Sequence, residues 1–161
     1  MSDLIILPLT VGEPLANYRN VKTAIERIHD ELGIGHRINF TGRIDNGEFV
    51  RQYARATVAV VPSVYEGFGL PVGEAMACAV PVISTTGGAL PEVVGDAGIL
   101  VPPADHMALA RAMREILGNP DLANELGLAG YQRVQAQFTW PKAAEKTVAA
   151  YREVIHGYRR I

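Results

Sequence analysis

Short apolar runs alternate with stretches of helical periodicity along the whole chain. Five apolar runs, each bounded by Gly, Pro or polar residues, predict β-strands; they are residues 4–9, 37–41, 57–61, 80–84 and 98–101. Between them, apolar residues recur at intervals of three and four, which predicts helices. This alternation is typical of α/β proteins, so we predict a Rossmann-like, doubly wound parallel sheet.

Capping residues place the ends of the predicted helices. A helix with apolar positions from Val21 to Leu32 should end at Gly33, and Asp45 or Asn46 should cap the next helix. Further helices are expected up to Ala77, at 91–94, at 107–117 after a cap at Asp105, from Pro120 or Asp121, and from Pro141 onward. No repeat or linker interrupts this order, so residues 1–161 form one predicted domain.

Composition narrows the classes of function. A chain of 161 residues with 48% hydrophobic residues can bury a substantial core, which argues against disorder. Its net charge of -2 lacks the basic excess of nucleic-acid-binding proteins, so we expect no nucleic-acid partner and a small-molecule site instead. A lone cysteine, Cys78, and a first apolar run too short for a signal or a membrane span point to the cytoplasm.

Three loops are candidates for chemistry because they follow predicted strands. In a doubly wound sheet, ligands bind beyond the carboxyl ends of the strands, where the loops 42–44, 63–71 and 85–88 should lie. Two of these loops, 63–71 and 85–88, contain two glycines each and lead to helix N-termini, whose free N–H groups and dipole favour a phosphate. The alternative is that the glycines only allow tight turns between strand and helix.

Two carboxylates accompany the middle loop. Glu66 lies in the loop and Glu74 in the helix that follows, with seven residues between them, so both can face one crevice. A carboxylate accepts directed hydrogen bonds from sugar hydroxyls and can stabilise positive charge at an anomeric carbon. The alternative is a pair of solvated surface residues, but the apolar, glycine-rich residues between them make that role less natural.

A resemblance to a known family rests on motifs spread over most of the chain. The motifs are PSVYEGFGLPVGEAMAC at 62–78, PVIS at 81–84, GGALPEVV at 87–94, GILVPPAD at 98–105 and FTW at 138–140. The chain resembles the retaining GT-B glycosyltransferases that carry the E-x7-E signature (glycosyl transferases group 1, family 4-like). The resemblance covers most of the sequence from about Arg37 onward and, more loosely, the part before it.

The resemblance implies retaining transfer of a hexose from a nucleotide-sugar donor, with this chain as the C-terminal, donor-binding domain of a two-domain enzyme. By motif position, Glu66 would be catalytic, contacting the hydroxyls of the transferred sugar, and Glu74 would bind the ribose. The backbone around Arg43 and Ile44 would meet the base. Backbone N–H groups would bind the sugar and diphosphate from Gly67, Phe68, Gly69 and Leu70.

The implied donor is a UDP-, GDP- or ADP-sugar. The chain contains no Asp-x-Asp, which fits a family that needs no metal for the leaving diphosphate. Neither the four histidines nor Cys78 shows metal-ligand spacing, and no G-x-G-x-x-G follows a strand. We therefore expect no metal and no cofactor.

Three departures from the family qualify this expectation. Ala79 stands where the family usually has glycine, the acceptor domain is absent, and residues 4–9 resemble the second strand of the family's domain rather than its first. With the strand order 3-2-1-4-5-6 the missing first strand would be central. A strand from another chain, altered pairing, or residues 4–9 themselves must fill the gap, and Pro8 disfavours the last.

These departures lead to expectations about partners. The isolated chain should be inactive without an acceptor domain or a partner chain, and it can self-associate through the incomplete sheet or the cleft face. Any contact with the inner membrane surface would come from the missing half. The alternative function is a non-catalytic nucleotide or nucleotide-sugar binding module or subunit. Tyr151 and Trp140 should pack the last helix against the domain.

Overall fold

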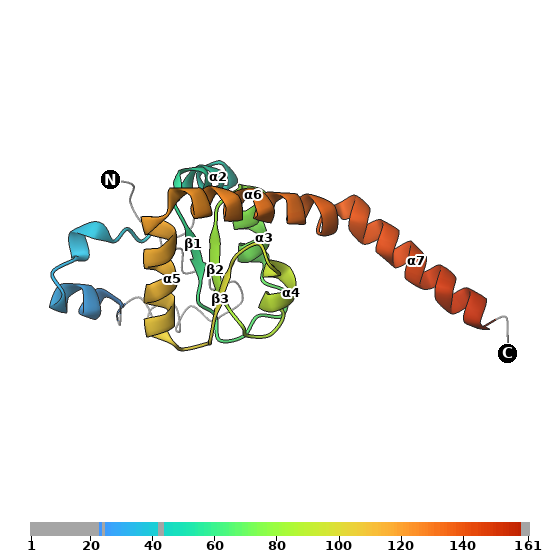
Figure 1. The fold of residues 1–161 in the computed structure, drawn as a ribbon, viewed down its shortest axis with the longest axis horizontal. Coiled ribbons are helices and arrows are strands. Elements are labelled where there is room, and N and C mark those ends of the chain that lie inside the picture. The colour runs from blue at the N-terminus through green and yellow to red at the C-terminus, as the bar shows by residue number, and fades with distance from the viewer. Residues whose placement is uncertain (1–22, 24, 42–43, 159–161) are drawn as a thin grey trace.

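The computed structural model describes residues 23, 25–41 and 44–158, so the predicted strand at 4–9 lies outside the described residues. Within them a parallel sheet is built from β1 (Ala59–Val61), β2 (Val82–Thr85) and β3 (Ile99–Val101), in the order β1-β2-β3. Figure 1 shows helices on both sides of this sheet and a long last helix that extends away from it. The predicted strands at 57–61, 80–84 and 98–101 are confirmed, each one or two residues shorter or shifted.

The described helices follow the predicted order. After a short 3₁₀ helix, η1 (Gly35–Arg37), they are α2 (Asn46–Arg55), α3 (Leu70–Ala77), α4 (Leu90–Val94), α5 (His106–Gly118), α6 (Pro120–Gln137) and α7 (Trp140–Tyr158). The carboxylates of Asp45 and Asp105 accept hydrogen bonds from the N–H groups of Glu48 and Ala108, each at 2.8 Å. These bonds satisfy amides that a helix leaves without partners, so both predicted aspartate caps are confirmed.

The prediction of a strand at residues 37–41 is wrong. Arg37 ends η1, and residues 38–41 have no regular secondary structure, although Ile38 has an extended backbone. An apolar run becomes a strand only where another strand pairs with its backbone. The helical turns before this segment end as predicted at Gly33, which has a φ of +66°.

Two apolar clusters lie on opposite faces of the sheet. On one face, Val61 and Val82 pack with residues of α3, α4 and α6, whereas on the other Ile83 and Val101 pack with residues of α5. Neighbouring residues of β2 therefore point into different clusters, as the alternation of side chains along a strand requires. Helices cover both faces, and this confirms the predicted doubly wound α/β class.

Close packing between α3 and α6 fixes the helix that carries Glu74. A Cβ atom on Gly127 would lie 2.4 Å from the carbonyl oxygen of Ala79, and one on Gly130 would lie 3.0 Å from Cγ of Met76. The absence of side chains at these two positions of α6 lets the helices approach each other over the fully buried Met76. α6 thus fixes the C-terminal end of α3, whereas the loop that precedes α3 lies at its other end.

Ala79 ends α3 in a conformation that favours glycine. Its φ is +55°, and its N–H donates to the carbonyl of Met76 at 2.9 Å while that of Val80 donates to Ala75 at 3.1 Å. This is the Schellman arrangement, in which the residue after the helix cap takes left-handed backbone angles. A glycine here, which the resemblance described above leads us to expect, would adopt this conformation without strain.

We expect Ala79→Gly to raise the free energy of unfolding by about 0.5–1 kcal/mol. Relief of the left-handed strain outweighs the extra entropy that glycine gives the unfolded chain. Urea denaturation followed by circular dichroism measures the change. The matched control, Ala77→Gly, replaces an exposed helical residue two positions earlier and should lower stability by about 0.5–1 kcal/mol. Equal losses in both variants would contradict the explanation.

Helix α7 does not pack as the sequence suggested. Tyr151 is 67% exposed and Trp140 is 90% exposed, and no residue of α7 is buried. Figure 1 shows why, since α7 continues past the end of α6 and away from the sheet. The apolar pattern of a helix predicts that one of its faces is buried, but it does not identify the element that buries it. Among the described residues, no helix combines the length and apolarity needed to cross a bilayer.

Candidate functional site

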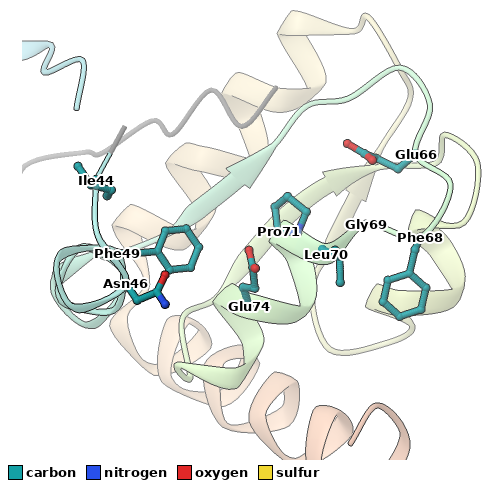
Figure 2. A pocket seen from close by; sticks show the side chains of 9 residues that line it. All are labelled: Ile44, Asn46, Phe49, Glu66, Phe68, Gly69, Leu70, Pro71 and Glu74. Atoms are coloured by element: carbon teal, nitrogen blue, oxygen red, sulfur yellow. The ribbon is translucent and has the colours of Figure 1, made fainter. Parts of the chain in front are cut away.

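A pocket of about 460 Å³ opens beside the N-terminus of α3 (Figure 2). Its walls come from the start of α2, from the loop that precedes α3, and from the first turns of α3 itself. The lining residues are Ile44, Asn46, Phe49, Glu66, Phe68, Gly69, Leu70, Pro71 and Glu74. Such a volume is within the usual range for small-molecule sites.

Most residues singled out from the sequence meet in this pocket. Glu66 and Glu74 both line it, and Figure 2 shows them coming from different elements, the loop and α3. Ile44 and the backbone from Phe68 to Leu70 line it as well. Gly67 lies in the same loop but does not line the pocket, and Arg43 lies outside the described residues.

Sequence reasoning missed three lining residues, Asn46, Phe49 and Pro71. Phe49 belongs to α2, where its ring meets Tyr53 edge-on, with centroids 4.9 Å apart. Their place in the sequence could have indicated Asn46 and Phe49, because the predicted helix cap and first turn directly follow the candidate loop 42–44. A side chain on the first turn of a helix can serve both the core and a pocket beside it.

Glu66 is held in place by hydrogen bonds to its carboxylate and to its backbone carbonyl. The Ser63 hydroxyl donates to Oε1 of Glu66 at 2.8 Å, and the N–H of Ala89 donates to the Glu66 carbonyl at 2.9 Å. The Thr85 hydroxyl in turn donates to the Ser63 carbonyl at 2.5 Å. The carboxylate is therefore oriented before any ligand arrives, which reduces the entropy that binding must overcome.

The loop 85–88 supports Glu66. The N–H of Gly87 donates to the Thr85 hydroxyl at 3.2 Å, and none of these residues lines the pocket. A Cβ on Gly87 would lie 2.1 Å from the carbonyl oxygen of Val64, and one on Gly88 2.3 Å from that of Glu66. The glycines thus allow the loops 85–88 and 63–71 to touch, and binding of a phosphate by this loop stays a prediction.

Glu74 is half-buried, and no interaction found in the described part of the chain offsets the burial of its carboxylate. Burial raises the pKa of Glu74 above the usual 4.5, and no hydrogen bond or ion pair to its carboxylate is found among the described residues. Burial also raises the pKa of Cys78, and the negative charge of Glu74 raises it further. A carboxylate left in this state can lower its free energy by accepting hydrogen bonds from a ligand.

The N-terminus of α3 offers backbone donors at the pocket. Gly69 caps the helix with a φ of +88° and no side-chain hydrogen bond, and a Cβ there would lie 2.8 Å from Cδ2 of Leu90. The N–H groups from Gly67 to Leu70 take part in none of the hydrogen bonds found among residues 44–158. Free N–H groups and the positive end of a helix dipole attract anions.

Two aromatic rings and an arginine connect α6 with this loop. Phe68 meets Phe138 edge-on with ring centroids 5.9 Å apart, and the guanidinium of Arg133 lies 6.0 Å from the centre of the Phe138 ring. Arg133 also donates to the carbonyls of Val93 and Glu92 at 2.9 and 2.8 Å. The end of α6 and the end of α4 thereby support the wall of the pocket that contains Phe68.

The family profile described as "Glycosyl transferases group 1" matches residues 11–133. The chain belongs to this family. Its relatives include an MMP alpha-(1->4)-mannosyltransferase from Mycolicibacterium hassiacum, 39% identical over 81% of this chain and 32% of the relative. The glycosyltransferase chain spans about a third of the length of the curated relatives that it matches.

Solved glycosyltransferase structures agree with this assignment. Sucrose-phosphate synthase from Thermosynechococcus elongatus is similar with a TM-score of 0.75 and 41% identity, over 86% of this chain and 35% of that one. The C-terminal domain of a group 1 glycosyl transferase (LpcC) from Francisella tularensis is similar with a TM-score of 0.69 and 31% identity, over 75% of this chain and 64% of that one. The fold is therefore that of the C-terminal half of a GT-B glycosyltransferase.

A further structural match, at 20% identity, shares the fold. It is Anabaena HepE, solved in complex with UDP, with a TM-score of 0.76 over 87% of this chain and 38% of that chain. In the described part of the glycosyltransferase chain, no group of three or more His, Cys, Asp or Glu residues is arranged to hold a metal ion, and we assign no metal site there.

Proposed function

We propose that this chain is the donor-binding half of a retaining glycosyltransferase and holds a nucleotide sugar in the pocket beside α3. One observation carries the proposal. An uncompensated carboxylate, a carboxylate fixed by hydrogen bonds and the free N–H groups of a helix N-terminus converge on one open cavity. Hydroxyl groups and a diphosphate are the ligand groups that match these three features.

Within this proposal, each part of the donor has its own partner. The diphosphate lies at the N-terminus of α3, where the N–H groups from Gly67 to Leu70 donate to it. Glu74 accepts hydrogen bonds from the ribose hydroxyls, and Glu66 faces the hydroxyls of the transferred sugar near the reacting carbon. The backbone around Arg43 and Ile44 meets the base. The UDP in HepE supports a nucleotide with a diphosphate as the class of ligand.

The chemical step follows from these positions. As the bond between the anomeric carbon and the diphosphate breaks, negative charge grows on the diphosphate and positive charge on the sugar ring. Oriented N–H groups stabilise the first charge without reorganising, and a fixed carboxylate stabilises the second. Donor binding therefore needs no metal, whereas transfer needs an acceptor domain that completes the cleft.

Isothermal titration of the folded chain with UDP, GDP and ADP tests the proposal. At least one diphosphate should bind with a dissociation constant between about 10 µM and 1 mM, while its parent nucleoside binds at least tenfold more weakly. Excess EDTA should leave the affinity unchanged. If the folded chain binds none of the three nucleotides and none of their hexose conjugates, the donor-site proposal is wrong. Retention is a separate test, made by NMR of the product anomer once an acceptor domain is supplied.

A further inference from the structure

A buried threonine connects β1 and β2 beyond the point where their backbone pairing stops. The last paired residues are Val61 and Ser84, and Pro62 has no N–H group with which to continue the pairing. One position farther along β2, the hydroxyl of Thr85, which is 2% exposed, donates to the carbonyl oxygen of Ser63 at 2.5 Å. Ser63 is therefore fixed to the end of β2 by a side chain and not by the sheet.

The segment 63–66 is fixed at both ends to the loop that follows β2. Thr85 holds the carbonyl of Ser63, and the N–H of Ala89 donates to the carbonyl of Glu66 at 2.9 Å. A fixed backbone does not fix a glutamate side chain, which loses rotamer entropy when it is held in one orientation. Among the described residues, the Ser63 hydroxyl is the only group found hydrogen-bonded to the Glu66 carboxylate, at 2.8 Å from Oε1.

The direction of this hydrogen bond distinguishes the two carboxylate oxygens of Glu66. An ionised carboxylate only accepts hydrogen bonds, so the Ser63 hydroxyl must donate. Oε1 is thereby engaged by the protein. Oε2, to which no hydrogen bond is found within the described chain, is left for a ligand in the pocket that Glu66 lines. Because hydrogen bonds to an ionised group are stronger than neutral ones, the Ser63 contact can hold the side chain in place.

We propose that Ser63, held by Thr85, is a positioning residue for Glu66 and directs Oε2 of that carboxylate to the hydroxyls of the transferred hexose. The inference rests on the proposed function, since it concerns the sugar end of the same donor. Ser63 does not itself line the pocket, so it acts through Glu66. Its effect is therefore confined to the hexose, and binding of the nucleoside diphosphate beside α3 does not depend on it.

Titration calorimetry of the whole chain separates the sugar from the nucleotide. The probes are UDP with UDP-glucose, GDP with GDP-mannose, and ADP with ADP-glucose. The measured quantity, called the sugar ratio below, is the dissociation constant of the conjugate divided by that of the free diphosphate. Ser63→Ala should raise the sugar ratio about fivefold while the affinity for the free diphosphate changes less than about twofold. Ser63→Thr keeps a hydroxyl and should return the sugar ratio to within about twofold of the unmodified chain.

The neighbouring hydroxyl provides a matched control for loss of a buried hydrogen bond. The Ser84 hydroxyl donates to the carbonyl of Val61 at 3.0 Å, away from Glu66. Ser84→Ala should lower the free energy of unfolding in urea denaturation but leave the sugar ratio unchanged. Thr85→Val keeps the shape of the side chain and removes the hydroxyl that holds Ser63, so it should raise the sugar ratio. Circular dichroism confirms that each variant is folded.

A double-mutant cycle tests whether Ser63 acts through Glu66. Glu66→Ala should raise the sugar ratio at least as much as Ser63→Ala does. When Ser63→Ala is added to Glu66→Ala, the sugar ratio should change by less than about twofold, because no carboxylate is left to position. Two residues that contributed independently would instead multiply their effects.

The outcomes separate this inference from the proposed function. If none of the three diphosphates and none of their conjugates binds, the proposed function fails and the role of Ser63 fails with it. If a diphosphate binds, only the positioning role is wrong when no conjugate binds or when Ser63→Ala leaves the sugar ratio unchanged. It is equally wrong when Ser84→Ala raises the sugar ratio as much, or when Ser63→Ala keeps its full effect in the absence of Glu66.

Discussion

Replacing Gly88 with alanine is expected to lower the free energy of unfolding by about 3 kcal/mol and to remove nucleotide binding. Gly88 has a φ of +64°, and a Cβ there would lie 2.3 Å from the carbonyl oxygen of Glu66. Both the backbone strain and the overlap with backbone atoms add to the cost, because neither loop has a flexible side-chain end that could move aside. The contact that positions Glu66 has to break.

Urea denaturation measures the loss of stability, and titration calorimetry measures binding at a temperature where the variant is folded. The matched control is Gly73→Ala in α3, where an added Cβ meets nothing within 4 Å. It should raise the free energy of unfolding by about 0.5–1 kcal/mol, because alanine favours the helix. If Gly88→Ala is as stable as the unmodified chain, the close contact of the two loops is not what fixes Glu66.

Glu74→Gln is expected to weaken nucleotide binding by about tenfold at pH 7 without lowering the free energy of unfolding. The amide keeps the shape of the side chain but loses one acceptor and the charge that strengthens hydrogen bonds to hydroxyls. The stability result follows from the raised pKa of Glu74. A carboxyl whose pKa is higher in the folded than in the unfolded state is charged at a cost to the fold at neutral pH.

The raised pKa of Glu74 also determines how the stability difference between Glu74→Gln and the unmodified chain changes with pH. Above the raised folded pKa, the charged carboxylate disfavours folding, so the glutamine variant is as stable as the unmodified chain or more so. As the pH falls below the unfolded value near 4.5, both states are protonated and the difference disappears. Denaturation at pH 4 and pH 7 measures it. Glu92→Gln, at an exposed position of α4, is the control and should change neither binding nor stability.

The outcome separates two roles for Glu74. A functional carboxylate loses binding while the fold keeps or gains stability, because the unfavourable charge serves the ligand and not the fold. A purely structural carboxylate would lose stability and binding together. A clear fall in the free energy of unfolding of Glu74→Gln at pH 7 would therefore contradict the role proposed for this residue.

The strands at the centre of the sheet could be predicted because their sequences leave little choice. Val82 and Ile83 are fully buried on opposite faces, and Ser84 and Thr85 after them are buried as well, so neither face of β2 is open to solvent. The run at 37–41 carries the same local signal, and residues 38–41 nevertheless have no regular secondary structure. Local apolar composition therefore does not by itself decide where a strand forms.

The candidate site was predictable where its parts follow predicted strands, as Ile44 does, or lie close together in the sequence. Glu66 and Glu74 flank a single loop and helix start, so their spacing already placed them on one pocket. The support of the site was missed because it depends on approaches between distant segments. Thr85 reaches Ser63 across 22 positions, and Arg133 reaches Val93 across 40.

The ring of Phe138 lies between the pocket and the start of the last helix. It closes α6, it touches Phe68 in the wall of the pocket, and α7 begins only two residues later at Trp140. A change in the direction of α7 that displaces Phe138 would therefore also disturb Phe68 in the wall of the pocket.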